Sequence, residues 1–241
     1  DADWDLIYRV HVLGSYKVTH AAWPYLREQQ FGRVIMTASA AGLYGNFGQA
    51  NYSMAKLGLL GFAKSLAIEG QSKNILTNTI APVAGSRMTE TVMPKELVDA
   101  LKPEYVSPLV AWLCHDDCTE NGAVFEVGAG WHGKLRWQRV KGWTQPLSKG
   151  LTIEDVQKNY DKIGDFSDVT YPTSAMESAM GIGENLRTLE AGAKGGNENI
   201  DPEKVLAFKF PATKATYDER DVSLYALGIG AAGVVSDPSE L

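Results

Sequence analysis

Three short apolar segments, separated by stretches of helical periodicity, constrain the fold of this 241-residue chain more than any other feature. Each segment is bounded by Gly, Pro or polar residues, as the buried strands of a parallel sheet are. The three segments are 33–39, 74–81 and 123–127. Apolar residues recur at helical spacing over 4–26, 51–69, 94–101 and 104–113. This alternation predicts an α/β fold with a doubly wound parallel sheet of Rossmann type.

Beyond Gly130 the periodicity is lost, and residues 131–150 are basic and aromatic without a clear repeat. Two short helices are predicted after this stretch, each opened by a hydroxyl side chain with an acidic residue three positions later. The two capping pairs are Thr152 with Asp155 and Ser174 with Glu177.

The last part of the chain predicts a linker followed by a new domain. Residues 190–201 are rich in Gly and polar side chains, and a strand at 205–210 and a helix from Thr216 follow. We therefore divide the chain into 1–143, a helical extension and linker at 144–204, and the start of a second domain at 205–241. Because the chain opens inside a helical pattern and stops soon after a new apolar pattern has begun, both ends are interpreted as truncations.

The composition excludes several classes of function. The net charge of −6 argues against a general nucleic-acid-binding protein, and no apolar run approaches the length of a membrane span. The two cysteines, Cys114 and Cys118, are too few for a disulfide scaffold and favour a reducing compartment. With His115 they would supply only three metal ligands at unsuitable spacing, so we expect reduced structural thiols and no metal site.

The strongest chemical signal is the combination of Ser39, Tyr52 and Lys56. Ser39 ends the first predicted strand, at the carboxyl edge where open α/β sheets place their ligands. Tyr52 and Lys56 are four residues apart near the start of a predicted helix, so they share one face of it. A lone Tyr-x-x-x-Lys pattern is weak, but a serine at the preceding strand end makes the pattern much more specific.

These residue types suit the transfer of a proton during alcohol oxidation. Hydride transfer between a nicotinamide and an alcohol also requires a proton to move at the substrate oxygen. A tyrosine can move that proton near neutral pH only when its phenolate is stabilised, and a lysine ammonium one turn away provides that stabilisation. The serine hydroxyl can hold the substrate oxygen within hydrogen-bonding range of the tyrosine.

Together with Asn-Thr-Ile-Ala-Pro at 78–82, this combination resembles the short-chain dehydrogenase/reductase family. The resemblance covers 3–130 and implies the C-terminal half of that Rossmann-type fold. Several stretches are more specifically similar to the peroxisomal multifunctional enzymes of type 2, in which a (3R)-hydroxyacyl-CoA dehydrogenase unit precedes an enoyl-CoA hydratase 2 unit. Those stretches are 45–53, 66–70, 85–89 and 125–131, and 217–230 resembles the opening helix of the hot-dog-like hydratase.

The resemblance implies a role for each site residue. Tyr52 is the acid/base, Lys56 holds the nicotinamide ribose and tunes Tyr52, and Ser39 orients the substrate. Tyr52, Lys56 and Pro82 are the expected contacts of the cofactor, which the resemblance implies to be NAD.

The resemblance also implies a substrate, a location and an assembly. The parent enzyme is expected to oxidise (3R)-hydroxyacyl-CoA to 3-oxoacyl-CoA in peroxisomal fatty-acid β-oxidation, to carry enoyl-CoA hydratase 2 activity as well, and to form a homodimer through helices at 3–26 and 51–69. No nucleic acid and no membrane is expected as a partner. The Gly-rich loop that binds the pyrophosphate and the acidic residue that recognises the ribose are absent from the sequence. We therefore expect the chain by itself to be inactive.

Four residues near the site leave alternatives open. His11 occupies the place of an asparagine that supports a proton-relay water in most members of the family, and it is either a relay residue or a packed helical histidine. Val83 follows Pro82 where a glycine is usual, which changes the local contacts expected for the nicotinamide. Asn51 and Gln49 either line the mouth of the site or stabilise the turn before the helix.

Other interpretations compete with this one. The basic residues Lys134, Arg136, Arg139 and Lys141 either contact the phosphates of CoA or form a solvated basic loop. A different enzyme of the same fold, such as an oxoacyl-carrier-protein reductase or a hydroxysteroid dehydrogenase, is the first rival for the activity. The other rival is a non-catalytic, dimer-forming fragment.

Overall fold

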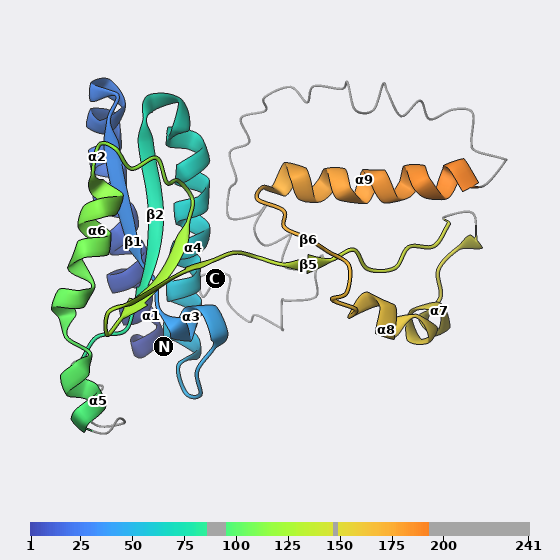
Figure 1. The fold of residues 1–241 in the computed structure, drawn as a ribbon, viewed down its shortest axis with the longest axis horizontal. Helices are drawn as coiled ribbons and strands as arrows, with labels where there is room; N and C mark the ends of the chain where they lie inside the picture. The colour runs from blue at the N-terminus through green and yellow to red at the C-terminus, as the bar shows by residue number, and fades with distance from the viewer. Residues whose placement is uncertain (86–94, 147–148, 193–241) are drawn as a thin grey trace. The chain divides into compact units, whose positions relative to one another are not determined.

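The computed structural model describes residues 1–85, 95–146 and 149–192, and its central feature is a four-stranded sheet in the order β1-β2-β3-β4 (Figure 1). The strands β1 (Gly32–Thr37), β2 (Ile75–Pro82) and β3 (Val124–Gly128) run parallel. Each begins and ends within two residues of the corresponding predicted strand. The predicted parallel α/β sheet is therefore confirmed.

The fourth strand, β4 (Trp131–Leu135), lies in the basic and aromatic stretch without a clear repeat, and the sequence did not predict it. β4 pairs antiparallel with β3 across a two-residue turn. The turn residues Ala129 and Gly130 have φ angles of 47° and 77°. Two-residue hairpins require positive φ at such positions and are usually marked by Asn-Gly or Asp-Gly. Ala-Gly does not signal this turn, which is why the hairpin was missed.

Helices cover both faces of the sheet, as the sequence predicted (Figure 1). On one face, α4 (Ala50–Gly70) packs Leu59, Ala63 and Leu66 against Met36 of β1. On the other face, Leu113 of α6 (Ser107–Cys114) packs with buried apolar side chains of β2, β3 and the loop before β3. Those partners are Ile80, Val127 and Cys118. Burial of apolar area against both faces stabilises this layered arrangement.

The first predicted helix is confirmed, but it is not uniform. It consists of α1 (Ala2–Ile7), a π-helical segment η1 (Tyr8–Leu13) and α2 (Gly14–Gln29). A π-helical turn contains an extra residue relative to an α-helical turn, and such segments often occur at functional sites. His11 lies on η1.

Shorter elements complete this part of the chain. The stretch between β1 and α4, which is rich in Ala and Gly and which we expected from the sequence to be a loop, contains a helix, α3 (Ala40–Tyr44), capped by Ser39; the loop prediction was wrong there. The predicted helices at 94–101 and 104–113 correspond to α5 (Lys95–Ala100) and to η4 (Pro103–Tyr105) followed by α6. A 3₁₀ turn, η2 (Gln71–Lys73), connects α4 to β2.

After β4 the chain forms short elements. β5 (Arg139–Val140) pairs with β6 (Val169–Thr170), and α7 (Ile153–Lys158), α8 (Tyr160–Ile163) and α9 (Ala175–Gly192) are helical. Both predicted caps are confirmed, since Asp155 N–H donates to Thr152 Oγ1 at 3.2 Å and Glu177 N–H to Ser174 Oγ at 3.1 Å. α9 is longer than predicted and extends into the expected linker.

Several predictions lie outside the described residues: the rest of the linker, the strand at 205–210, the helix from Thr216 and the hydratase-like stretch at 217–230. Asp1–Gly142 and Asn159–Glu177 form one compact unit, and the predicted domain boundaries stay predictions. Among the described helices, none has the length and apolar character needed to span a bilayer. Cys118 is buried and Cys114 exposed, and both thiols are free.

Candidate active site

Ser39 lies just beyond the carboxyl end of β1, where it forms the N-cap of α3. Its Oγ accepts a hydrogen bond from the Ala41 N–H at 3.3 Å. Its carbonyl oxygen accepts from the N–H groups of Gly42 and Leu43 at 2.9 and 3.1 Å. These bonds fix the backbone at the strand end, while the serine hydroxyl keeps its proton for an acceptor outside α3.

Tyr52 and Lys56 lie one helical turn apart in the first part of α4. The Lys56 Nζ is 5.6 Å from the centroid of the Tyr52 ring. Lys56 is 7% exposed, and its Nζ donates a hydrogen bond to the carbonyl oxygen of Thr37 at 2.8 Å. Because Thr37 is the last residue of β1, this bond joins the lysine to the strand end that leads into Ser39.

Lys56 is an isolated buried cation. Burial lowers the pKa of its ammonium group, and no carboxylate among the described residues forms an ion pair with it. Unpaired buried charges are costly, and proteins concentrate them at functional sites. An ammonium has three N–H donors, and the bond to Thr37 uses one of them. The remaining donors fit a ligand with vicinal hydroxyl groups, such as a ribose.

His11 approaches the site from η1. Its ring meets the Tyr52 ring edge-to-face, with centroids 5.4 Å apart and an interplanar angle of 80°. Burial, and then the positive charge of Lys56, lower the pKa of His11. The His11 carbonyl oxygen accepts a hydrogen bond from the Ser15 hydroxyl at 2.7 Å. The structure therefore places the His11 ring against the tyrosine and engages the backbone carbonyl of the same residue.

Pro82 ends β2 at the same carboxyl edge of the sheet. The next residue, Val83, continues the pairing, since its N–H donates to the carbonyl oxygen of Val127 at 2.8 Å. A Cβ on Gly128 would lie 2.5 Å from the Val83 carbonyl oxygen. Gly128 thus makes room for the backbone of Val83, the residue that departs from the usual pattern.

Asn51 and Gln49 form hydrogen bonds at the start of α4. The Asn51 Oδ1 accepts from the Tyr52 N–H at 2.8 Å. The Gln49 Oε1 accepts from the Asn46 Nδ2 at 2.9 Å, and Gln49 is the N-cap residue of α4. These contacts favour a structural role for Asn51 and Gln49 over a role in lining the mouth of the site.

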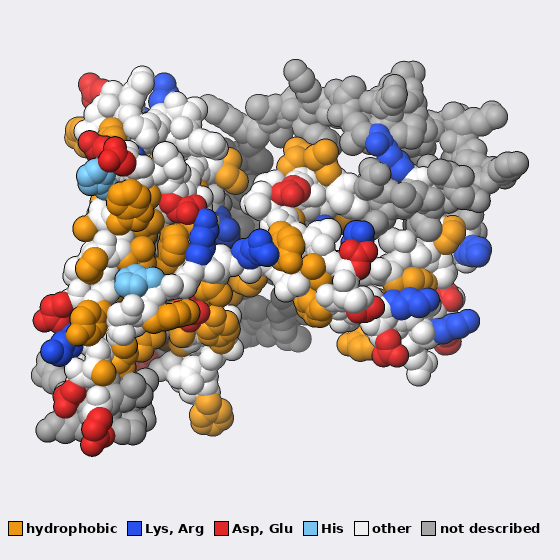
Figure 2. Space-filling model, viewed as in Figure 1, with side chains coloured by type: hydrophobic (Ala, Val, Ile, Leu, Met, Phe, Trp, Pro, Cys, Tyr) orange, Lys and Arg blue, Asp and Glu red, His pale blue; other side chains and the backbone are white. Residues whose placement is uncertain are grey.

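The basic residues at 134–141 have intramolecular partners. Lys134 Nζ and Lys141 Nζ each lie 2.7 Å from a carboxylate oxygen, of Glu120 and Asp168 respectively. Arg136 stacks over a tyrosine ring, with its Cζ 3.7 Å from the centroid. On the face shown in Figure 2, Lys and Arg side chains lie among Asp and Glu rather than in one broad patch. The structure favours an anchoring role for these residues over contacts with CoA.

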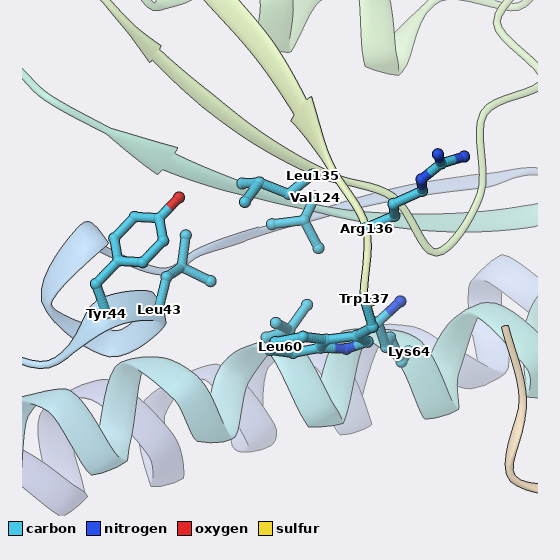
Figure 3. Close-up of a pocket in the computed structure, with 8 residues that line it drawn as sticks. All are labelled: Leu43, Tyr44, Leu60, Lys64, Val124, Leu135, Arg136 and Trp137. Carbon is cyan, nitrogen blue, oxygen red and sulfur yellow. The ribbon is translucent and has the colours of Figure 1, made fainter. Parts of the chain in front are cut away.

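A small apolar pocket of about 50 Å³ lies between α3, α4 and the hairpin of β3 and β4 (Figure 3). None of Ser39, Tyr52 and Lys56 lines it. Its residues are Leu43, Tyr44, Leu60, Lys64, Val124, Leu135, Arg136 and Trp137. The Lys64 Nζ donates to the Gly122 carbonyl oxygen at 3.1 Å. We interpret this pocket as a packing gap under the hairpin rather than as the reaction site.

The Thr37 carbonyl is a contributor to the site that the sequence did not reveal. The Thr37 carbonyl oxygen accepts the hydrogen bond that holds the Lys56 ammonium in place. A backbone oxygen carries no side-chain signature. The available signal was positional, because a lysine on the helix after a strand can reach the last carbonyl of that strand.

Residues 1–101 match the family model described as short chain dehydrogenase. The chain is 51% identical over 256 residues to the peroxisomal multifunctional enzyme type 2 of Mus musculus, covering 100% of this chain and 34% of the relative. It is 57% identical over 182 residues to the peroxisomal multifunctional enzyme A of Dictyostelium discoideum, covering 76% and 41%. The chain thus spans well under half the length of these relatives.

Solved structures show the same similarity. Full-length peroxisomal multifunctional enzyme type 2 from Drosophila melanogaster matches with a TM-score of 0.72 and 40% identity, covering 96% of this chain and 40% of that one. A short chain dehydrogenase from Mycobacterium avium matches with a TM-score of 0.57 and 32% identity, covering 68% of this chain and 59% of that one.

Proposed function

We propose that this chain carries the proton-transfer centre of an NAD-dependent (3R)-3-hydroxyacyl-CoA dehydrogenase, and the match of residues 1–101 to the short chain dehydrogenase family model supports this proposal. The observation that carries the proposal is the buried Lys56, held on the Thr37 carbonyl one helical turn from Tyr52. A tyrosine can act as the base at a secondary alcohol near neutral pH when such a cation stabilises its phenolate.

Oxidation of the 3-hydroxy group to a 3-oxo group removes a proton from oxygen and a hydride from carbon. NAD, when bound, accepts the hydride. The Tyr52 phenolate accepts the hydroxyl proton, and the positive charge of Lys56 stabilises the phenolate. The Ser39 hydroxyl donates a hydrogen bond to the substrate oxygen and keeps it within reach of Tyr52.

Lys56 and Pro82 are the residues of this chain that would hold the nicotinamide end of the cofactor. The free donors of Lys56 suit the ribose hydroxyls, and Pro82 ends the neighbouring strand at the same edge of the sheet. Short-chain dehydrogenases use NAD or NADP. We propose NAD on the strength of the resemblance to the multifunctional enzymes.

The substrate and location proposed for the whole protein rest on its relatives. Two relatives, from Neurospora crassa and Saccharomyces cerevisiae, are named peroxisomal hydratase-dehydrogenase-epimerase, at 49% and 50% identity. These names support a peroxisomal dehydrogenase. Action on acyl-CoA in fatty-acid β-oxidation is proposed from the sequence resemblance to the multifunctional enzymes. An accompanying enoyl-CoA hydratase 2 activity is proposed from the sequence resemblance at 217–230.

A homodimer is proposed through the helices that flank the site. Large apolar side chains are exposed on both, including Val18 at 72% and Tyr25 at 70% on α2 and Ile68 at 65% on α4. Apolar side chains exposed on neighbouring helices are typical of protein–protein interfaces.

The proposal is tested with the full-length gene product and purified hydroxyacyl-CoA enantiomers. We expect NADH formation with the (3R) substrate, and much slower reduction with the (3S) substrate or with NADP. Preference for the (3S) enantiomer, for a carrier-protein substrate or for a hydroxysteroid would contradict the proposal. A protein that prefers the (3R) substrate but uses NADP in preference to NAD would contradict only the proposal for the cofactor.

A further inference from the structure

Gly42 lies at the contact between α3 and α4, beside the residue that supplies the buried ammonium. It is buried in α3. An added Cβ would lie 2.8 Å from the backbone nitrogen of Leu57, 2.9 Å from the Cβ of Lys56 and 3.0 Å from the carbonyl carbon of Lys56. The two helices therefore touch at Lys56 because residue 42 has no side chain.

The atoms that a side chain at residue 42 would meet cannot swing away. Two of them are backbone atoms of α4 and the third is the first carbon of the lysine side chain. A long side chain could move its far end at little cost, but these atoms move only with the helix. Interiors are close-packed, so an added methyl group would displace α3 and α4 relative to one another.

The same residue is bonded directly to the serine end of the site. The Gly42 N–H donates to the carbonyl oxygen of Ser39 at 2.9 Å. Residue 42 thus connects Ser39, through one hydrogen bond, with Lys56, through one steric contact. The Lys56 side chain is also hydrogen-bonded to the carbonyl oxygen of Thr37, the last residue of β1.

From this arrangement we propose that Gly42 is a positioning residue that sets the distance between Ser39 and the turn of α4 carrying Tyr52 and Lys56. The inference rests on the proposed function, because the distance matters only if these residues act on one substrate. A misplacement of about 1 Å in a reacting constellation can cost about 10²-fold in rate.

The test compares Gly42→Ala with Gly183→Ala in the full-length gene product. Gly183 is also a helical glycine, and a Cβ there meets no atom within 4 Å. For Gly42→Ala we expect kcat to fall at least about tenfold while both KM values change less than about threefold. The deuterium isotope effect on kcat with 3-deuterated substrate should rise, because the chemical step becomes slower. Gly183→Ala should leave these constants unchanged.

Each other outcome identifies a different failure. Wild-type protein without dehydrogenase activity overturns the proposed function and with it this inference. If the wild type is active and Gly42→Ala has a normal kcat and a normal isotope effect, the positioning role of Gly42 is overturned and the proposed function stands. Thermal unfolding of both variants separates the remaining case: a Gly42→Ala protein that fails to fold, or that loses stability but keeps its kcat, makes Gly42 a residue of the fold only.

Discussion

The lysine at the start of α4 and the basic residues after β4 show two different ways in which this chain uses positive charge. Lys56 is 7% exposed and bonds to a backbone carbonyl, with no carboxylate paired to it among the described residues. Lys134 and Lys141 have side chains that are 53% and 59% exposed, and each contacts a carboxylate at 2.7 Å. Burial of an unpaired charge, as at Lys56, lowers the stability of the fold. Exposed ion pairs, as at Lys134 and Lys141, change the stability of the fold little.

The difference supports the chemical role proposed for Lys56. A paired surface cation has its field cancelled by its partner and screened by solvent. A buried cation without a counter-charge projects its field onto its neighbours. The Lys56 Nζ lies 5.6 Å from the centroid of the Tyr52 ring, and its charge lowers the pKa of His11. Counting basic residues alone would have pointed to the other region.

Replacement of Tyr52 by Phe should give the largest effect. The change removes the phenolic oxygen, which as a phenolate is the proposed proton acceptor, and keeps the ring that contacts His11. We expect kcat of the full-length enzyme to fall by about 10²–10⁴-fold with no loss of thermal stability, since loss of a positioned acid/base has that cost. Near-normal turnover by the folded variant would remove Tyr52 from the mechanism.

Replacement of Lys56 by Met keeps the length of the side chain but removes its charge. We expect kcat to fall about 100-fold, because the phenolate is no longer stabilised, and KM for NAD to rise. Ser39→Ala should mainly lower kcat. A Lys56→Met enzyme with a normal kcat would place the source of activity elsewhere.

The same variant gives a pH test of burial. Burial lowers the pKa of Lys56 from the ordinary lysine value of 10.5, so between its folded pKa and 10.5 the unfolded state binds more protons. The free energy of unfolding of wild type therefore rises with pH in that window. Wild type should gain stability relative to Lys56→Met as the pH rises towards 10.5. A difference in unfolding temperature that does not vary over the alkaline range would contradict the burial of a charged lysine.

Much of the fold could be predicted because buried parallel strands leave a clear apolar signature. The strands and the packing of α4 and α6 followed from that signature. β4 and α3 did not, for two reasons. The hairpin turn uses Ala129 with positive φ, which alanine does not signal, and α3 depends on a single capping serine. Local backbone geometry determined both, and the residue types there are compatible with loops.

The site was predicted in its residue types but not in its contacts. Helical spacing placed Tyr52 and Lys56 on one face, and the strand end placed Ser39 nearby. The anchor of Lys56 on the Thr37 carbonyl and the edge-to-face contact of His11 depend on tertiary packing, so no sequence pattern could reveal them. The roles of these residues stay predictions until the variants are measured.

His11 should give an intermediate effect and decide between the two roles left open for it. Its ring packs against Tyr52, so His11→Ala removes a wall of the site, and we expect kcat to fall about tenfold. His11→Phe keeps the ring contact and removes the nitrogens, and we expect it to retain kcat within about threefold of wild type. If His11→Phe is as impaired as His11→Ala, the imidazole takes part in proton transfer rather than packing alone.

Replacement of Lys134 by Ala should give the smallest effect and is the sharpest test of the contrast between the two regions. Lys134 is paired with Glu120, whose side chain is 34% exposed, so the pair is screened and should contribute less than about 1 kcal/mol to stability. We expect KM for acyl-CoA to change less than about twofold, because the charge is already neutralised within the chain.

Glu120→Ala and the double variant complete a double-mutant cycle with Lys134→Ala, measured by thermal unfolding at low and high salt. The coupling should be small and should decrease with salt. A large rise in KM for acyl-CoA in Lys134→Ala, with KM for NAD unchanged, would instead show that this residue binds the phosphates of CoA. The basic stretch would then be a second functional use of charge, and the contrast with Lys56 would no longer hold.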